Sequence, residues 1–167
     1  TSGLNIGLFG YVGSSSSSAE IHNIGLTGEL MNVIGEEPSG GLVGTAYNSS
    51  ITASYATGAV TGQYSTGGLV GYASEDSSII ASYTTGTVTG NASYTGGLVG
   101  YAGRNSRITA SYATGAVTGA KHAGGLVGYT GRASITASYA TGLVSGSTTG
   151  GVAGSLISSS ISASYWS

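Results

Sequence analysis

The chain has 167 residues, of which 32 are glycine, one is proline and none is cysteine. Only 6% of the residues are charged and the formal net charge is −2, which argues against nucleic acid as a partner. The missing cysteines exclude disulfides and thiolate metal sites, whereas the 40% apolar share favours a packed core over a disordered chain. No run of about 18 apolar residues is present, so we expect no membrane span.

In chain order, residues 1–39 form a divergent first copy of a repeat, and regular copies fill residues 40–167. Ile21 of the first copy aligns with Ile51 of the next, and Gly7–Gly10 aligns with Gly41–Gly44. Each regular copy holds a strand from its Ile, a Gly turn, a short strand such as that at Val60, a variable linker and a strand through Gly-Leu-Val-Gly. Thr, Val, Ile, Tyr and Gly dominate these segments and no 3.6-residue period is sustained, so we expect strands rather than helices.

Two phrases recur at one period. Gly-Gly-Leu-Val-Gly stands at 40–44, 67–71, 96–100 and 124–128, and Ile-Thr-Ala-Ser-Tyr-Ala-Thr-Gly interleaves with it. The leading Ile of the second phrase recurs after 28, 29, 27 and 26 residues. Such a period is typical of stacked repeats. The sequence therefore predicts an all-β, parallel β-solenoid of about six coils with roughly 28 residues per coil, forming a single domain over 1–167.

Stacking turns each repeated position into a column of equivalent residues about 4.8 Å apart. We expect the Ile and Leu columns to be core, from Ile51 and Leu42 onward. The orientation of the Tyr column is open, because strict alternation from Ile51 places Tyr55 inside. The first copy favours the opposite, since its apolar residues Ile24 and Leu26 occupy the Ser54 and Ala56 positions. We prefer Ser and Ala inward and Tyr outward, with a bulge near Ala53.

Residues that could carry catalysis are scarce. The chain has one Asp and two His, and its only paired acids, Glu36/Glu37 and Glu75/Asp76, fall in expected turns. Calcium-binding solenoid repeats need an Asp in every copy, which this chain lacks. We therefore expect no enzyme activity, no metal and no cofactor.

The charges are divided along the chain, with every acid in the first half and every base in the second. Because sequence order is axial order in a solenoid, one end is expected to be negative and the other positive. Neither terminus has a helical pattern that would cap a strand edge, so we also expect exposed edges that favour self-association. The candidate residues for end-to-end assembly are Glu20, Glu29, Glu36, Glu37, Arg104, Arg107, Lys121, Arg132, Tyr165 and Trp166.

Gly-Gly-Leu-Val-Gly, Ser-Tyr-Ala-Thr-Gly and the terminal Ser164-Tyr165-Trp166 resemble the GLUG-motif repeats of bacterial and archaeal surface proteins. The resemblance covers residues from about 4 to 166. It implies an extracellular or cell-surface setting with a structural or adhesive role, and it brings no catalytic residues. Family repeats often have Asn and Cys where this chain has Ala53 and Ser54, and only Asn23 keeps the Asn.

Two functions of different classes are open. The first is a structural module, either a rod-like segment of a surface adhesin or a subunit that stacks head-to-tail into an extracellular filament. The second is a binding module for surface glycans or ice, built on a flat strip of Tyr and Thr. The residues of this candidate face are Tyr55, Tyr83, Tyr112, Tyr139, Thr57, Thr85, Thr114 and Thr141.

Overall fold

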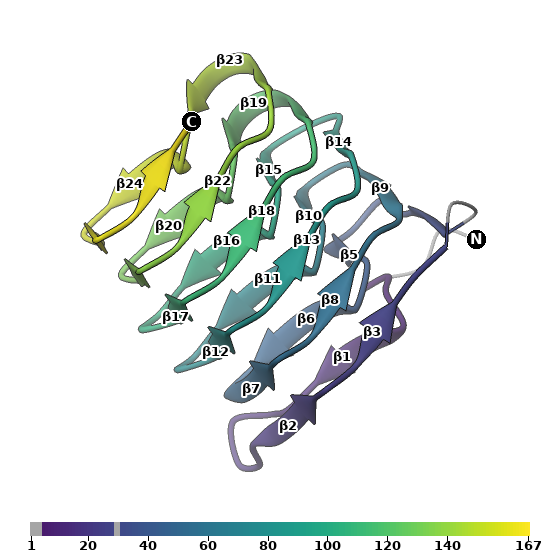
Figure 1. The fold of residues 1–167 in the computed structure, drawn as a ribbon. Helices are drawn as coiled ribbons and strands as arrows, with labels where there is room; N and C mark the ends of the chain where they lie inside the picture. Colours follow the sequence, from purple (N-terminus) through teal and green to yellow (C-terminus); the bar gives the residue numbers. More distant parts are fainter. Residues whose placement is uncertain (1–4, 29–30) are drawn as a thin grey trace.

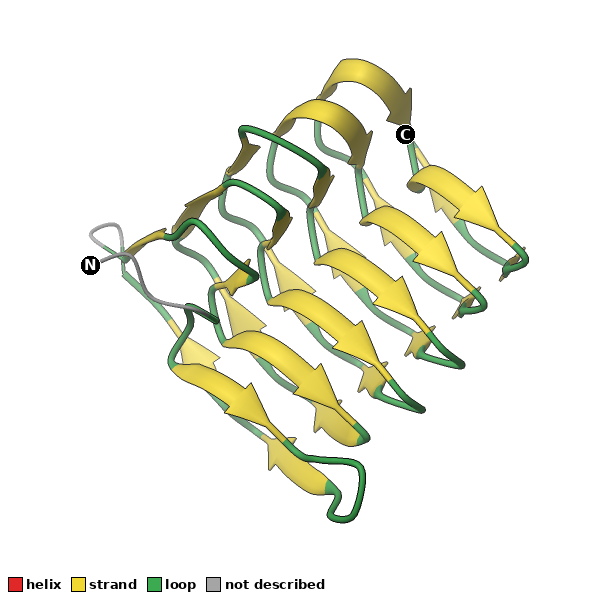
Figure 2. Cartoon of the chain, turned by 180° about the vertical axis from the view of Figure 1, so that it is seen from behind, coloured by secondary structure: helices red, strands yellow, loops and turns green. Residues whose placement is uncertain are grey.

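The computed structural model describes residues 5–28 and 31–167, and it confirms the expected parallel β-solenoid (Figure 1). Ile51 pairs with Ile79 and Ile79 pairs with Ile108, so each turn of the solenoid takes about 28 residues. Three of the four sheets hold six strands each. Strands and loops account for the described residues, with no helix among them (Figure 2), and so no helix there could span a membrane.

The four sheets, named A to D, run along the stack, and successive coils add one strand to each of sheets B, C and D. Sheet B consists of β1 (Phe9–Val12), β6 (Val43–Tyr47), β11 (Val70–Ser74), β16 (Val99–Gly103), β20 (Val127–Gly131) and β24 (Ala153–Ile157). Sheet C consists of β2 (Ala19–His22), β7 (Ser49–Thr52), β12 (Ser78–Ile80), β17 (Arg107–Thr109), β21 (Ser134–Thr136) and β25 (Ser160–Ser162). Sheet D consists of β3 (Gly25–Leu26), β8 (Tyr55–Ala56), β13 (Tyr83–Thr84), β18 (Tyr112–Ala113), β22 (Tyr139–Ala140) and β26 (Tyr165–Trp166).

Sheet A has two legs in every coil, which the long strand β19 (Val117–Gly124) joins into one sheet. The first leg contains β4 (Asn32–Ile34), β9 (Ala59–Gly62) and β14 (Val88–Gly90), and the second contains β5 (Ser39–Gly40), β10 (Ser65–Gly67) and β15 (Tyr94–Gly96). Strand β23 (Val144–Gly150) pairs with β19 over both legs. The variable linkers of the sequence thus lie between the two legs, where an insertion does not disturb the stacked strands.

The core consists of the expected columns. Leu42, Leu69, Leu98 and Leu126 are fully buried, and the Ile column is equally buried from Ile51 to Ile135. Val43 and its equivalents are buried as well, although they directly follow the Leu residues. Two consecutive residues can both face inward because the chain bends at the Leu, before sheet B begins.

The sequence suggested one continuous strand from Ile51 to the turn at Gly58, but a corner divides this segment into two strands. β7 ends at Thr52, and Ala53 adopts a left-handed conformation with φ of 49°, as do its equivalents in the other regular coils. The expected bulge is therefore a one-residue corner that separates sheet C from sheet D. This conformation costs an alanine roughly 1–2 kcal/mol, so the contacts of the next residue must hold it in place.

Those contacts come from a buried serine column. Ser82 Oγ donates to the Ile80 carbonyl at 2.9 Å and accepts the Ser54 N–H of the preceding coil at 3.2 Å. Ser111 and Ser138 repeat the pattern in the following coils. Because the serines and the Ala56 column point inward, the tyrosines between them point outward, as preferred from the sequence.

The glycines of Gly-Gly-Leu-Val-Gly allow neighbouring coils to approach closely. A Cβ on Gly97 would lie 2.1 Å from the carbonyl oxygen of Gly125 and 2.8 Å from the Ala113 Cβ. No side chain fits at this distance, so the repeated phrase reflects the spacing of the coils rather than a ligand loop.

Candidate functional site

The Tyr column of sheet D is a continuous stack of half-buried rings that ends at the exposed Tyr165. Tyr83 lies 4.8 Å from Tyr55 and 4.8 Å from Tyr112 between ring centroids, with interplanar angles of 5° and 3°. Burial, and then the neighbouring Tyr83 and Tyr139, raise the pKa of Tyr112 above its usual value. Each inner ring therefore has another ring against both faces, so the ring faces are covered and only part of each ring remains exposed.

The Thr column follows two residues after each tyrosine, on the same side of the chain. Thr85, Thr114 and Thr141 are exposed and Thr57 is half-buried. Their backbone N–H groups continue the ladder, as when Thr114 N–H donates to the Thr84 carbonyl at 3.0 Å. The structure thus brings the predicted Tyr and Thr residues onto one strip along sheet D.

Sheet B carries a second tyrosine column that the sequence analysis did not single out. Tyr101 stacks on Tyr72 at 4.6 Å and on Tyr129 at 5.2 Å, and Tyr94 and His122 join the rings from sheet A. Burial, and then the neighbouring tyrosines, raise the pKa of Tyr101. The signal was present in the Tyr that follows Gly-Leu-Val-Gly in these coils.

Negative and positive charges are less separated along the solenoid axis than their order in the sequence suggests. Glu75 and Arg104 occupy equivalent turns of adjacent coils and form an ion pair, which raises the pKa of Arg104 through the hydrogen bond and charge of Glu75. The last coil has no charged residue, so the bases nearest the C-terminal edge, Arg132 and Lys121, lie one coil inward.

The remaining charged candidates are spread over several surfaces. Arg107 is exposed on β17 in an inner coil. Glu20 is exposed on β2, whereas Glu36 and Glu37 lie in the turn before β5. Glu29 lies outside the described residues. The described candidate acids thus lie in or next to the first coil, whereas the candidate bases lie at least one coil inside the opposite end.

Both end surfaces of the solenoid expose apolar side chains. At the C-terminal edge, Leu156, Ile157, Tyr165 and Trp166 are 46–58% exposed. At the opposite edge, β1 exposes Phe9 and Tyr11, and Leu8 precedes it. Among the described strands, β1 pairs only with β6 and β24 pairs only with β20.

Few side chains of the described residues could serve in acid–base catalysis or metal binding. Within the described ranges, His, Asp and Glu residues nowhere gather in a set of three that could hold a metal ion. Asp76 is exposed in a turn next to Glu75, whose carboxylate is engaged by Arg104. The feature that recurs in the regular coils is instead a surface column of stacked tyrosines.

Comparison with known proteins agrees with this geometry. The family model described as the GLUG motif matches four times, at residues 39–61, 62–89, 91–118 and 119–145. All four matches end in the first leg of sheet A, so each covers about one coil. No curated protein and no solved structure matched the chain. Since the matches cover more than half of the sequence, the chain belongs to the GLUG-motif family.

Proposed function

We propose that this chain is a non-catalytic structural segment of a secreted or cell-surface protein, in which stacked coils form a rod. One observation carries the proposal: the regular coils repeat the same core columns, serine column and glycine contacts in register. A fold of this kind gains length by adding coils, because each new coil meets the same surface as the last.

The end surfaces support an extension of this function to self-association. The edges of β24, β25 and β26 carry free backbone groups beside Leu156, Ile157 and Trp166, and the opposite edge offers the same strand directions. A coil from a second copy could pair there head-to-tail, which generates a filament because the contact is not closed by symmetry. Apolar contact and strand pairing would drive this association, since the last coil has no charge.

Light scattering and negative-stain electron microscopy of the purified chain over a range of concentrations test the filament. A lysine at Ile157, which is 51% exposed on the edge strand β24, should reduce assembly because a charge would be buried in the contact. The matched control is Ile80→Lys, because Ile80 is 37% exposed on β12 in the middle of the stack.

Two results would contradict the filament. One is a strict monomer at every concentration and salt level, and the other is an equal effect of Ile157→Lys and Ile80→Lys. Either result would leave the rod-like segment as the proposed function, because a segment receives its neighbouring coils from its own chain. Surface exposure is tested separately, by protease shaving of intact cells followed by mass spectrometry of the released peptides.

A binding face on sheet D is the alternative, and the alignment of the exposed Thr column with the Tyr column favours it. Because the ring faces cover one another, a glycan or ice would meet ring edges and hydroxyls there. A neutral-glycan array and a thermal-hysteresis measurement separate the two ligands. Alanine at Tyr83 or Tyr112 should abolish binding if the strip is a site, and should only lower stability if the column is structural.

A further inference from the structure

Two hollows lie side by side on the surface where sheet B turns into sheet C, and both are lined by Arg132. The first, here named the serine hollow, has a volume of about 410 Å³ and lies between Arg107 and Arg132. The second, named the tyrosine hollow, has a volume of about 390 Å³. Its lining includes Tyr101, Tyr129, Arg104, Arg132, Ile157 and Ser158. Neither hollow includes a residue of the Tyr and Thr strip on sheet D.

The tyrosine hollow lies where the second tyrosine column stops. Tyr129 stacks on Tyr101 on one side, but its register partner in the next coil, on β24, is Ser155. The neighbouring ring of His122 is likewise followed by Thr148. The face of Tyr129 toward the last coil therefore has no aromatic ring stacked on it from that coil, unlike the inner rings of sheet D.

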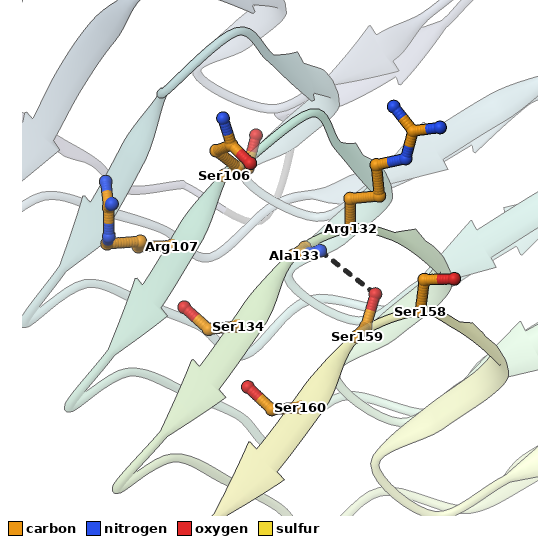
Figure 3. Close-up of a pocket in the computed structure, with 9 residues that line it drawn as sticks. Ser106, Arg107, Arg132, Ala133, Ser134, Ser158, Ser159 and Ser160 are labelled. Atoms are coloured by element: carbon orange, nitrogen blue, oxygen red, sulfur yellow. Dashed lines mark hydrogen bonds between the residues drawn. The ribbon is translucent and has the colours of Figure 1, made fainter.

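Cationic groups border both hollows. Among the described residues the only ion pair joins Arg104 to Glu75, so Arg107 and Arg132 have no carboxylate partner there. Figure 3 shows Arg107, Ser134 and Ser160 in line on successive strands of sheet C, where they are register partners, and Arg132 on the other side of the serine hollow. Ser159 is engaged within the fold, because its hydroxyl accepts the Ala133 N–H at 2.9 Å. The outer serines supply hydroxyls that can both donate and accept hydrogen bonds.

We propose that the two hollows form one binding site for an acidic oligosaccharide. A sugar ring packs on the free face of Tyr129, and its carboxylate or sulfate receives hydrogen bonds from the Arg132 guanidinium, which suits planar anions. The chain of sugars then crosses the corner into the serine hollow, where Ser134 and Ser160 meet its hydroxyls and Arg107 meets the next acidic group.

The surroundings favour a saccharide over other anions. A nucleic acid needs a broad positive surface, and this chain has four bases and a net charge of −2. An acidic peptide would offer carboxylates to Arg107 and Arg132 but few hydroxyls to the serines that line most of the serine hollow, whereas sugar units of an acidic oligosaccharide bring both. An apolar ring face beside a few polar groups fits the alternating apolar and hydroxyl surfaces of a sugar.

Isothermal titration calorimetry of the full chain tests the site with three hexasaccharides: an oligogalacturonate, a heparin fragment and neutral cellohexaose. We expect the acidic oligomers to bind and cellohexaose to bind at least tenfold more weakly. The carboxylated and sulfated probes then identify which anion is preferred. Arg132→Gln should weaken binding at least tenfold, because Arg132 lines both hollows.

The control variants separate a built site from general charge attraction. Lys121→Gln removes one positive charge from an exposed position on β19, outside both hollows, and should leave affinity within twofold. Tyr129→Phe keeps the ring face and should bind, whereas Tyr129→Leu should not, with circular dichroism confirming that each variant is folded. Absent binding of both acidic oligomers, equal binding of cellohexaose, or equal losses for Arg132→Gln and Lys121→Gln would each overturn the proposal.

Discussion

Alanine at Gly97 would test whether the repeated glycines set the spacing of the coils. The new Cβ would lie 2.1 Å from the Gly125 carbonyl oxygen, whereas ordinary van der Waals contact begins at 3.4 Å. The obstacle is backbone, so no side chain can rotate away. The two coils would have to separate locally by about 1.3 Å, because atoms closer than contact distance repel steeply.

This separation would break the hydrogen bonds on either side of the substitution. Gly97 N–H donates to the Gly124 carbonyl at 3.2 Å, and Leu98 N–H donates to the Leu126 carbonyl at 2.8 Å. Both distances would exceed hydrogen-bonding range after a shift of that size. A lost bond costs about 1 kcal/mol and an unpaired buried group about 1–3 kcal/mol, so we expect Gly97→Ala to destabilise the chain by about 3 kcal/mol.

Urea denaturation followed by circular dichroism measures this loss as a change in the free energy of unfolding. Gly131→Ala is the matched control, because its Cβ would have its nearest atom 3.2 Å away, in the Tyr129 side chain rather than in backbone. We expect the control to lose less than about 1 kcal/mol. Equal losses for the two variants, or a loss at Gly97 below about 1 kcal/mol, would refute the idea that coil spacing requires glycine there.

Three further comparisons test the core, a buried hydroxyl and a tyrosine. Leu98→Ala should destabilise the chain by about 2–5 kcal/mol in urea denaturation, whereas Leu143→Ala, at a 74% exposed position, should change it by less than about 0.5 kcal/mol. Thr84→Val should lower the melting temperature, because the Thr84 hydroxyl donates to the buried Gly97 carbonyl at 2.7 Å. Thr95→Val should not lower it, since the buried Thr95 hydroxyl has no hydrogen-bond partner among the described residues. Because the pKa of Tyr101 is raised in the folded state, the unfolded state loses this proton first as pH rises past the usual value of 10.0, and the free energy of unfolding falls. Tyr101→Phe should therefore flatten the alkaline loss of stability. An unchanged alkaline profile would contradict this.

The sequence predicted the fold closely because repetition makes each column visible. Leu42 and Ile51 recur with apolar residues at one period, and both columns are buried as expected. The orientation of Tyr55 was recoverable only from the divergent first copy, which places Ile24 and Leu26 at the flanking positions. The left-handed corner at Ala53 had a signal only in the same first copy, whose equivalent residue Asn23 belongs to a type that tolerates positive φ and has φ of 58°. Alanine gives no such signal, and the serine contacts that stabilise the corner come from the neighbouring coil.

The packing of Tyr94 and His122 from sheet A against the sheet B tyrosines could not be predicted, for a different reason. Tyr94 and Tyr129 are 4.8 Å apart between ring centroids, yet they belong to different sheets and adjacent coils. Their meeting depends on how the second leg of sheet A bends into sheet B, and no local pattern encodes that angle. The free face of Tyr129 depends in turn on a single departure from the repeat, the serine at 155.

The direction of the hydrogen bonds has a mechanical consequence. In all four sheets the bonds between coils run along the stack, so tension along that axis pulls each bond in its own direction and loads the coils one after another. A coil that detaches would release roughly 90 Å of chain, because about 28 extended residues replace one strand spacing. A stack of such coils would yield in steps under load, so each coil would act as an extensible element as well as a spacer.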